Sequence, residues 1–554
     1  SGVTALHVAC MYGQLEIATL LVEAQACLDL RTDSGASALW VAAFCGHLEL
    51  VHYLSTSRDV DLDSSDQCGI TPLAAAACQG HLSVVQLLAE RGAQLSSHTP
   101  CGYTPLHFAA AKGHLSVVQA LAQAGAPLEQ SPSSNLTALA AGVREGHLSV
   151  VRVLHGAGAQ IDPPCIPSVI CIAARAGDEQ MVRYLLEAGA GITATDSDGF
   201  SPLYIAAYRG HLVVVSQLIA AAGGADECRT KGKATGLHAA AHGNQLAVAE
   251  LLVNKGASIT SKDTGGFLPL HMAAESGAVA LAHFLVKRGS PVNCGTNSDV
   301  TPIALACARG HVPFIKELLS LGAVLTNQKK AKGTLLHIAA DAGQIDVVNL
   351  LLEAGHSSSE TDHAGLTPLH VAIEEGHIQV VRRLLDNDPS AKDTIVGGMP
   401  PLTRAACWGR LDAVQMLVAA GADLNKRDTH GLTAIHTCCL NGHLEVVKFL
   451  SSTSQRVANT VLTGTEKSKV RISRHRPPSP IEMAAIQGHV DTVMYLLRAL
   501  ALLGVSLEPV ATKCSERAQD HQRTAVVDAI EKCKGWTALH FCCAAGDVER
   551  VSSL

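Results

Sequence analysis

Hydrophobic and polar residues follow one pattern along this chain, and the pattern recurs about every 33 residues. In its clearest copy, residues 367–370 read Thr-Pro-Leu-His, residues 375–377 read Glu-Gly-His, and residues 380–385 contain Val-Val and Leu-Leu pairs. The apolar positions are spaced at the period of a helix with one buried face. Each copy therefore predicts two short helices joined by a turn.

The polar and glycine positions mark where these helices begin and end. The first residue of each copy, called position 0, is mostly Thr or Ser, whose hydroxyl can cap a helix. Proline often follows, and it suits the first helical position. Position 9 is mostly glycine, which ends the first helix because a positive φ costs it little. Asn244 takes this place once, and Asn is the next best residue there.

Position 0 occurs sixteen times, and thirteen of the fifteen intervals lie within two residues of 33. It is occupied by Thr4, Ser37, Thr71, Thr104, Thr137, Ser168, Ser201, Thr235, Leu268, Thr301, Thr334, Thr367, Pro400, Thr433, Ser479 and Thr537. A fixed period of this length indicates a stack of structural repeats rather than several globular domains.

The motifs resemble those of the ankyrin repeat family over nearly the whole chain. Thr-Pro-Leu-His at 104–107, Gly113-His114, Val117-Val118 and Gly125-Ala126 carry the resemblance. It implies an all-α solenoid in which each repeat of about 33 residues forms a helix-turn-helix and a β-turn finger. Partners of this family usually bind the concave face, formed by the fingers and the end of the first helix.

Two longer intervals interrupt the array. We expect repeats 1–14 over residues 1–451, a basic Pro-containing loop over 452–476, repeat 15 over 477–503, a second, partly helical insertion over 504–534, and a truncated repeat 16 over 535–554. The apolar positions of 517–532 line one side of an extra helix. Both chain ends fall inside the repeat pattern, so we interpret the sequence as a fragment of a larger protein.

The first insertion offers a secondary site. Arg474, Pro477 and Pro480 match an SH3-ligand pattern, and Ser473 and Ser479 are candidate phosphorylation sites. An SH3 domain or a kinase could therefore contact residues 464–480. The competing interpretation is stronger, because Ser479 and Pro480 also occupy positions 0 and 1 of repeat 15.

Composition and charge exclude several classes of protein. The net charge of −7 argues against a general nucleic-acid binder, and the longest apolar runs are too short for a membrane span. The 18 cysteines include no CxxC pair, and Cys10, Cys307 and Cys439 stand where other repeats have Ala. This usage favours reduced, buried thiols in a cytoplasmic protein, with a nuclear location as the alternative.

Histidine is abundant but regular. Of 27 histidines, 17 occupy either position 3 or position 10 of a repeat, where we expect hydrogen bonds between repeats. No histidine or cysteine spacing is typical of zinc, and no phosphate-binding or nucleophile motif occurs. We therefore expect no cofactor, no metal and no enzymatic activity.

The most informative variable positions lie at the end of the first helix and next to position 0. Aromatic and Arg side chains are enriched in binding hot spots. They give the candidate partner-binding residues Tyr12, Trp40, Phe44, Tyr103, Phe200, Tyr204, Tyr208, Arg209 and Trp408. All of them except Trp408 fall into two candidate patches, one in repeats 1–4 and another in repeat 7. Asp341, Glu374 and Glu375 form an acidic stretch that favours a basic partner segment.

The sequence thus predicts a non-catalytic scaffold that binds a protein or peptide segment on its concave face. The alternative is the regulatory ankyrin arm of a larger enzyme or channel, such as a ROCO-type kinase, a TRP-type channel or a ubiquitin ligase. A mechanical tether is a third hypothesis, which the two insertions weaken.

Overall fold

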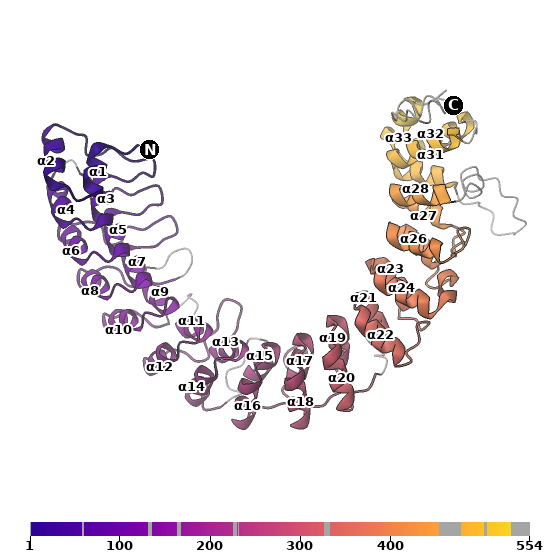
Figure 1. Cartoon of the computed structure of the whole chain (residues 1–554), viewed down its shortest axis with the longest axis horizontal. Helices are drawn as coiled ribbons and strands as arrows, with labels where there is room; N and C mark the ends of the chain where they lie inside the picture. Colours follow the sequence, from indigo (N-terminus) through magenta and orange to yellow (C-terminus); the bar gives the residue numbers. More distant parts are fainter. Residues whose placement is uncertain are drawn as a thin grey trace, which may run out of the picture. The chain divides into compact units, whose positions relative to one another are not determined.

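The structure is a computed structural model that describes residues 2–57, 60–130, 136–162, 168–224, 230, 232–325, 333–453, 478–502 and 507–532. It divides into an N-terminal unit, Ser1–Pro291, and a C-terminal unit, Val292–Leu554 (Figure 1). The described residues form 32 α-helices and one short 3-10 helix, and they contain no strand beyond an isolated bridge between Val396 and Met399. The chain is therefore all-α, as the repeat pattern predicts.

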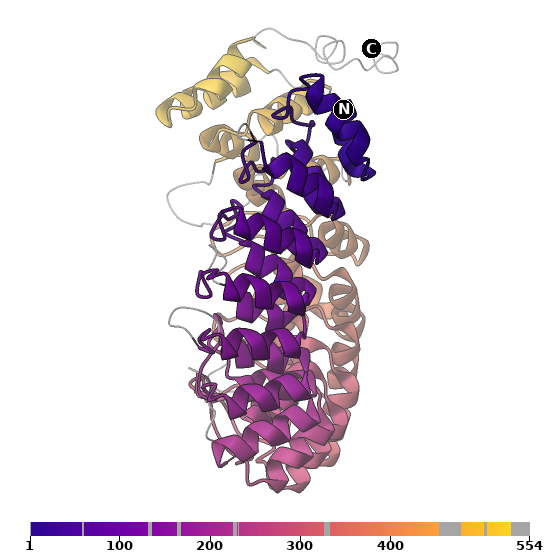
Figure 2. The ribbon, with the colours of Figure 1, turned by 90° about the vertical axis from the view of Figure 1, so that its left-hand side faces the viewer.

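In the N-terminal unit, nine repeats each contribute two helices (Figure 2). The first helices are α1 (Ala5–Met11), α3 (Ala38–Cys45), α5 (Pro72–Gln79), α7 (Pro105–Lys112), α9 (Ala138–Arg144), α11 (Val169–Ala176), α13 (Pro202–Arg209), α15 (Gly236–His242) and α17 (Pro269–Ser276). The second helices are α2 (Leu15–Glu23), α4 (Leu48–Ser55), α6 (Leu82–Glu90), α8 (Leu115–Gln123), α10 (Leu148–Gly156), α12 (Glu179–Glu187), α14 (Leu212–Ala222), α16 (Leu246–Asn254) and α18 (Val279–Lys287).

The C-terminal unit repeats the same arrangement. Its first helices are α19 (Pro302–Arg309), α21 (Leu335–Asp341), α23 (Pro368–Glu375), α25 (Pro401–Cys407), α27 (Ala434–Asn441), α30 (Pro480–Gln487) and α32 (Glu508–Asp520). Its second helices are α20 (Val312–Ser320), α22 (Ile345–Glu353), α24 (Ile378–Asn387), α26 (Leu411–Ala419), α28 (Leu444–Thr453), α31 (Val490–Leu502) and α33 (Thr524–Lys532), and η1 (Pro389–Asp393) follows α24. Residues 454–477 and 533–554, with most of the basic loop and all of repeat 16, lie outside the described residues.

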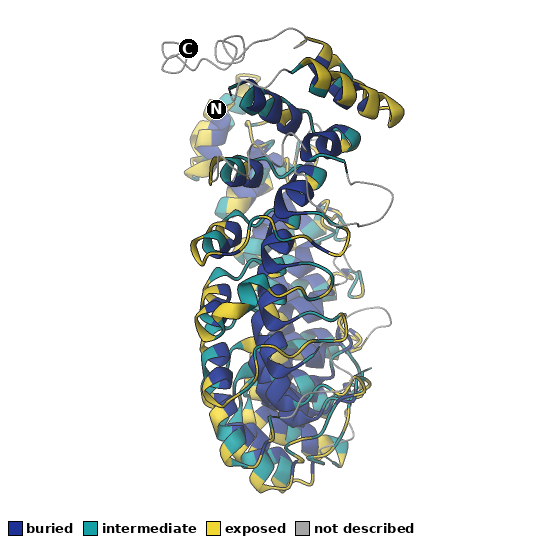
Figure 3. Ribbon diagram, turned by 90° about the vertical axis from the view of Figure 1, so that its right-hand side faces the viewer, coloured by how far each residue is buried: buried dark blue, intermediate teal, exposed yellow. Residues whose placement is uncertain are grey.

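The core of each unit lies between its two rows of helices. Leu106, Val117, Val118 and Leu121 are fully buried in repeat 4, and the equivalent positions are buried in its neighbours. Figure 3 shows buried residues in dark blue along the helices, whereas exposed residues gather in the fingers and on the outer sides of the helices. Each repeat buries its apolar residues between its own two helices and against adjacent repeats, so the core is continuous along a unit.

The helix boundaries follow from the residues named above. Ser37 Oγ accepts a hydrogen bond from the backbone N–H of Trp40 at 3.2 Å, and Thr71 Oγ1 accepts one from Ala74 at 3.3 Å. Asn244 adopts a φ of 55°, in the left-handed region that glycine occupies at position 9 of other repeats. Ser479 and Pro480 begin α30, as positions 0 and 1 predict.

The histidine at position 3 joins each repeat to the finger that follows it. His107 Nδ1 accepts a hydrogen bond from the backbone N–H of Thr104 at 3.2 Å. The neutral ring therefore carries its proton on Nε2, which donates to the Leu136 carbonyl at 3.0 Å. The same contact, across 29 residues, is made by His7, His238 and His337.

The histidine at position 10 connects each repeat to the preceding one. His114 Nε2 donates to the Cys78 carbonyl at 3.0 Å, and the ring lies over Gly80. A Cβ atom at Gly80, whose φ is +85°, would lie 2.7 Å from His114 Nδ1. Glycine is thus required there for its conformation and for space. The same histidine-to-carbonyl bond is made by His47, His81, His147, His211, His377, His443 and His489.

The second insertion contains two helices where the sequence pattern predicts one. α32 packs against α30 and α33 against α31, as helices of successive repeats do. The chain turns between them at Gln522, whose φ is 57°, and Arg523 Nε donates to the Ile486 carbonyl at 3.2 Å. Arg523 thereby makes the contact that His makes at position 10 elsewhere. The segment lacks the Thr-Pro-Leu-His motif but has the geometry of a repeat.

Alanine at Gly80 should destabilise the protein more than alanine at Gly92. Both glycines have a φ near +90°, so both substitutions impose backbone strain of about 1–2 kcal/mol. Only Gly80 faces a histidine ring, since nothing lies within 4 Å of a Cβ at Gly92. We expect an additional loss of about 1–3 kcal/mol for Gly80→Ala, measured by urea unfolding. Equal losses would show that the His114 ring does not require the glycine.

Stability should also fall as the pH is lowered from 6.5 to 4. Burial lowers the pKa of His107 from its ordinary value of 6.5 to about 4, and burial together with Arg404 does the same for His370. Between these values the unfolded chain binds protons that the folded chain does not, so folding becomes less favourable. Each site can contribute up to about 3 kcal/mol.

Urea midpoints measured across this pH range test the effect of these histidines. In His107→Gln the pH dependence should be shallower than in the wild type, because one of the titrating groups is gone. The same slope in both proteins would contradict a role for His107.

Candidate functional site

The exposed side chains that could bind a partner lie on the finger face. We define this face as the surface formed by the fingers and by the last turns of the first helices. Positions 7 and 8 lie on it, and several hold large apolar residues with at least 40% of their surface exposed: Met11, Tyr12, Phe44, Tyr208 and Trp408. Exposed aromatic residues on this face are candidates for contact with a partner.

Repeat 7 carries a row of three aromatic rings. Phe200, at the end of the finger, stacks on Tyr204 with ring centres 4.7 Å apart and planes 12° apart. Tyr208 follows one turn later in α13 and meets His242 of α15 edge to face at 5.3 Å. A spacing of four residues places Tyr204 and Tyr208 on the same side of α13, and the stacking of Phe200 on Tyr204 adds the third ring to the row.

These rings line a hollow of about 300 Å³ on the finger face. Four of the candidate residues border it: Phe200, Tyr204, Tyr208 and Arg209. The remaining lining residues, which the sequence did not single out, are Arg175, Asp198, Ile205 and His242. The hollow can take one large apolar side chain, with charged groups at its edge.

An ion pair holds the finger beside this hollow. Arg175 Nη2 donates to Asp196 Oδ2 at 2.7 Å, and Asp196 Oδ1 accepts from the backbone N–H groups of Asp198 and Phe200. The Asp196 side chain is 6% exposed and that of Arg175 is 52% exposed. The negative member is therefore buried in the finger, and the positive member faces solvent. Burial also raises the pKa of Tyr204, which keeps its hydroxyl protonated.

Among the candidate residues of repeats 1–4, Trp40 and Phe44 lie in direct ring contact. Their rings stack with centres 5.1 Å apart. Trp40 Nε1 also donates to the Ile70 carbonyl at 2.9 Å, the bond that His makes at position 3 of other repeats. Trp40 therefore has a structural role as well. Tyr12 is exposed at the end of α1, and Tyr103 packs within its own repeat.

Trp408 belongs to a cluster that reduces the acidity predicted for this region. The Trp408 indole donates to Glu374 Oε1 at 3.2 Å, and the Arg404 guanidinium pairs with the same oxygen. Arg404 is 8% exposed. Glu374 is thus largely neutralised, and Asp341 and Glu375 are the acidic side chains that remain exposed.

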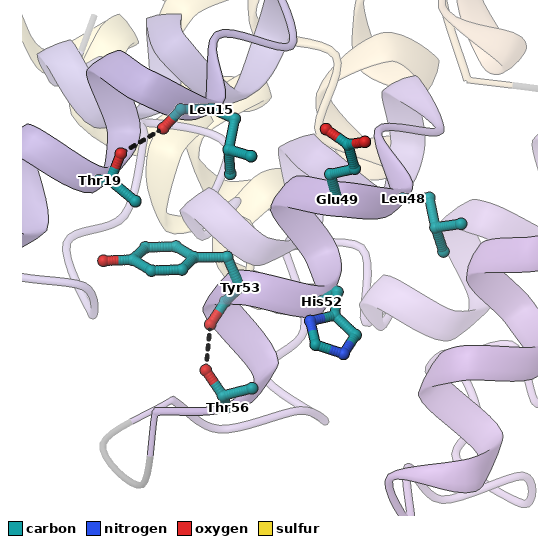
Figure 4. A pocket seen from close by; sticks show the side chains of 7 residues that line it. All are labelled: Leu15, Thr19, Leu48, Glu49, His52, Tyr53 and Thr56. Carbon is teal, nitrogen blue, oxygen red and sulfur yellow. Dashed lines mark hydrogen bonds between the residues drawn. The ribbon is translucent and has the colours of Figure 1, made fainter.

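A larger hollow of about 530 Å³ lies on the second helices, between α2 and α4 (Figure 4). Two of its hydroxyls are used by the helices themselves: Thr19 donates to the Leu15 carbonyl and Thr56 to the Tyr53 carbonyl. Its charged group, Glu49, stands apart from these hydroxyls, so no set of polar groups converges there. The smaller hollow of repeat 7 is the stronger candidate, because aromatic and charged side chains converge on it.

The sequence analysis missed a recurring aspartate in the fingers. At position −5, the carboxylate accepts hydrogen bonds from backbone N–H groups two and four residues further on, and so shapes the turn. The residues are Asp66, Asp196, Asp263 and Asp428. The sequence carries a signal for this turn, since position −5 is either Asp or Thr in most repeats.

Comparison with known families agrees with this geometry. A family model of three ankyrin repeats matches residues 1–66, 56–131, 73–165, 138–230, 170–263, 214–297, 270–362, 336–428 and 401–461. The chain belongs to the ankyrin repeat family. A search of curated proteins found no match.

Ankyrin repeats are modules for protein interaction, and the family is typically not enzymatic. Within the described ranges of this ankyrin chain, no group of three or more His, Cys, Asp or Glu is placed to hold a metal ion. No helix in these ranges is long and apolar enough to cross a membrane. Burial raises the pKa of Cys10 and Cys307 to about 12, so these thiols are inert packing groups.

The contribution of Glu374 to stability should depend on the buried guanidinium of Arg404. Glu374→Gln leaves a buried guanidinium without its charge partner, so we expect a loss of about 3 kcal/mol in urea unfolding. Arg404→Met restores the apolar residue that Met272 and Met483 provide at the same position. In the Arg404→Met background, Glu374→Gln should therefore cost less than about 1 kcal/mol. A full loss in both backgrounds would disprove the coupling.

Proposed function

We propose that this ankyrin chain is a non-catalytic scaffold that binds a protein or peptide segment on the finger face, anchored in repeat 7. The observation that carries the proposal is the row of Phe200, Tyr204 and Tyr208 bordering a hollow of about 300 Å³. Tyr208 is 40% exposed beside charged side chains. Aromatic anchors surrounded by polar groups are typical of binding hot spots.

The rigidity of this site supports the same function. Phe200 is fixed by stacking and by the hydrogen bond that Asp196 makes to its backbone, and Tyr208 is fixed by His242. A site held in its binding conformation loses little side-chain freedom when a partner docks. The exposed aromatic ring of Phe44, in the same N-terminal unit, would provide a further contact along a longer partner.

Selection of random peptides displayed on phage tests the proposal. The chain is the bait, and the enriched peptides are synthesised for fluorescence anisotropy against the wild type, Tyr208→Ala and Val213→Ala. Val213 is the matched control, because it is 43% exposed on the second helix of the same repeat. We expect Tyr208→Ala to weaken binding at least about tenfold, and Val213→Ala less than about twofold.

The proposal is wrong if the enriched peptides bind Tyr208→Ala as tightly as the wild type. The circular dichroism of both variants should match that of the wild type, so that a loss of binding is not a loss of fold.

A further inference from the structure

Basic side chains end five successive first helices, and they lie next to the hollow of repeat 7. They are Lys112 in α7, Arg144 in α9, Arg175 in α11, Arg209 in α13 and His242 in α15. All stand at position 7 or 8 on the finger face, and the four Lys and Arg side chains are exposed. We call these five residues the basic row.

Helix stability alone does not account for the basic row. A cation at a helix C-terminus interacts favourably with the helix dipole, so every first helix would gain from one. In the same unit, α1, α3, α5 and α17 have no basic residue in the last turn. The basic residues are instead confined to consecutive repeats around the aromatic row.

Nearby acids do not cancel the positive surface. Asp196, the partner of Arg175, is buried, whereas the arginine is half exposed. Glu145 pairs with Arg144 at 2.9 Å, but both side chains are exposed. Each arginine has five N–H donors, so these pairs leave donors directed at solvent. Asp198 is an exposed acid bordering the hollow, and it lies in the finger rather than at the helix ends.

The spacing of the basic row suits an extended peptide that crosses the helices. Neighbouring helices pack about 8–10 Å apart, and an extended chain advances about 3.3 Å per residue. One repeat therefore corresponds to about three residues of an extended peptide.

Deepening the function proposed above, on which this inference rests, we propose that the finger face of repeats 4–8 binds an acidic segment in extended conformation. Its Asp or Glu side chains, about three residues apart, pair with the basic row, and one apolar side chain enters the hollow. Arginine binds carboxylates well because its planar fork matches their two oxygens. A nucleic acid fits less well, since the hollow has the size of one apolar side chain.

The test uses the peptides that depend on Tyr208 in the phage selection. They should be net acidic, and replacing their Asp and Glu by Asn and Gln should weaken binding at least about tenfold. Arg209→Glu should cause a similar loss. Arg309→Glu is the matched control, because Arg309 is exposed at position 8 of α19 but lies outside the basic row. It should change binding less than about twofold.

Two further measurements, of salt dependence and of nucleic-acid binding, complete the test. Binding of the acidic peptides should weaken as salt is raised from 50 to 300 mM. If the peptides that depend on Tyr208 are neutral or basic, the proposal of an acidic partner is wrong, whereas the proposed function of repeat 7 in binding still holds. A single-stranded 20-mer oligonucleotide that binds more tightly than these peptides, and is lost in Arg209→Glu, would overturn it in favour of nucleic acid. If the binding of no peptide depends on Tyr208, the proposed binding site in repeat 7 is itself wrong.

Discussion

The structure depends on one contact that recurs between adjacent repeats: a side chain at position 10 lies over the glycine of the preceding repeat and donates to a carbonyl there. His114 over Gly80 is one instance. The carbonyl belongs to the last turn of a helix, where a C=O group has no hydrogen-bond partner within the helix. The contact therefore satisfies a helix end, positions the next repeat and requires glycine. Gln344 and Arg410 can replace histidine because they offer an N–H at the same place.

This contact also determines which positions are available for function. The side chain at position 10 bonds the backbone carbonyl of position 7. The side chain of position 7 can therefore vary without loss of the stacking between repeats. Position 3 is different in several repeats, since a His or Trp side chain there donates to a backbone carbonyl of the next finger. Trp40 and Tyr208 illustrate the difference: the indole of Trp40 donates to a backbone carbonyl, whereas Tyr208 presents its ring at a hollow. An aromatic side chain thus serves packing at one position and a surface at the other.

Most of the fold could be predicted from the sequence, because the period, the caps and the glycines are local signals. The repeat formed by α32 and α33 could not, since it keeps the left-handed turn at Gln522 and the bond of Arg523 with none of the usual residues. Only part of the candidate site could be predicted from the sequence. Position alone indicated Tyr208 and Arg209, but the ion pair between Arg175 and Asp196 joins a helix end to the finger that follows it and depends on how that finger folds.

The charge of the finger face follows from where each acid is buried, which composition cannot reveal. A net charge of −7 predicts an acidic surface, yet the helix ends beside the hollow of repeat 7 carry exposed Arg175 and Arg209. Asp196 is responsible for much of this difference, because its carboxylate is turned inward to bind the backbone of its finger. Shaping the finger removes a negative charge from the surface, and the same residue orients Arg175 beside the hollow. The turn that builds the repeat thereby also sets the electrostatics of the face on which a partner would bind.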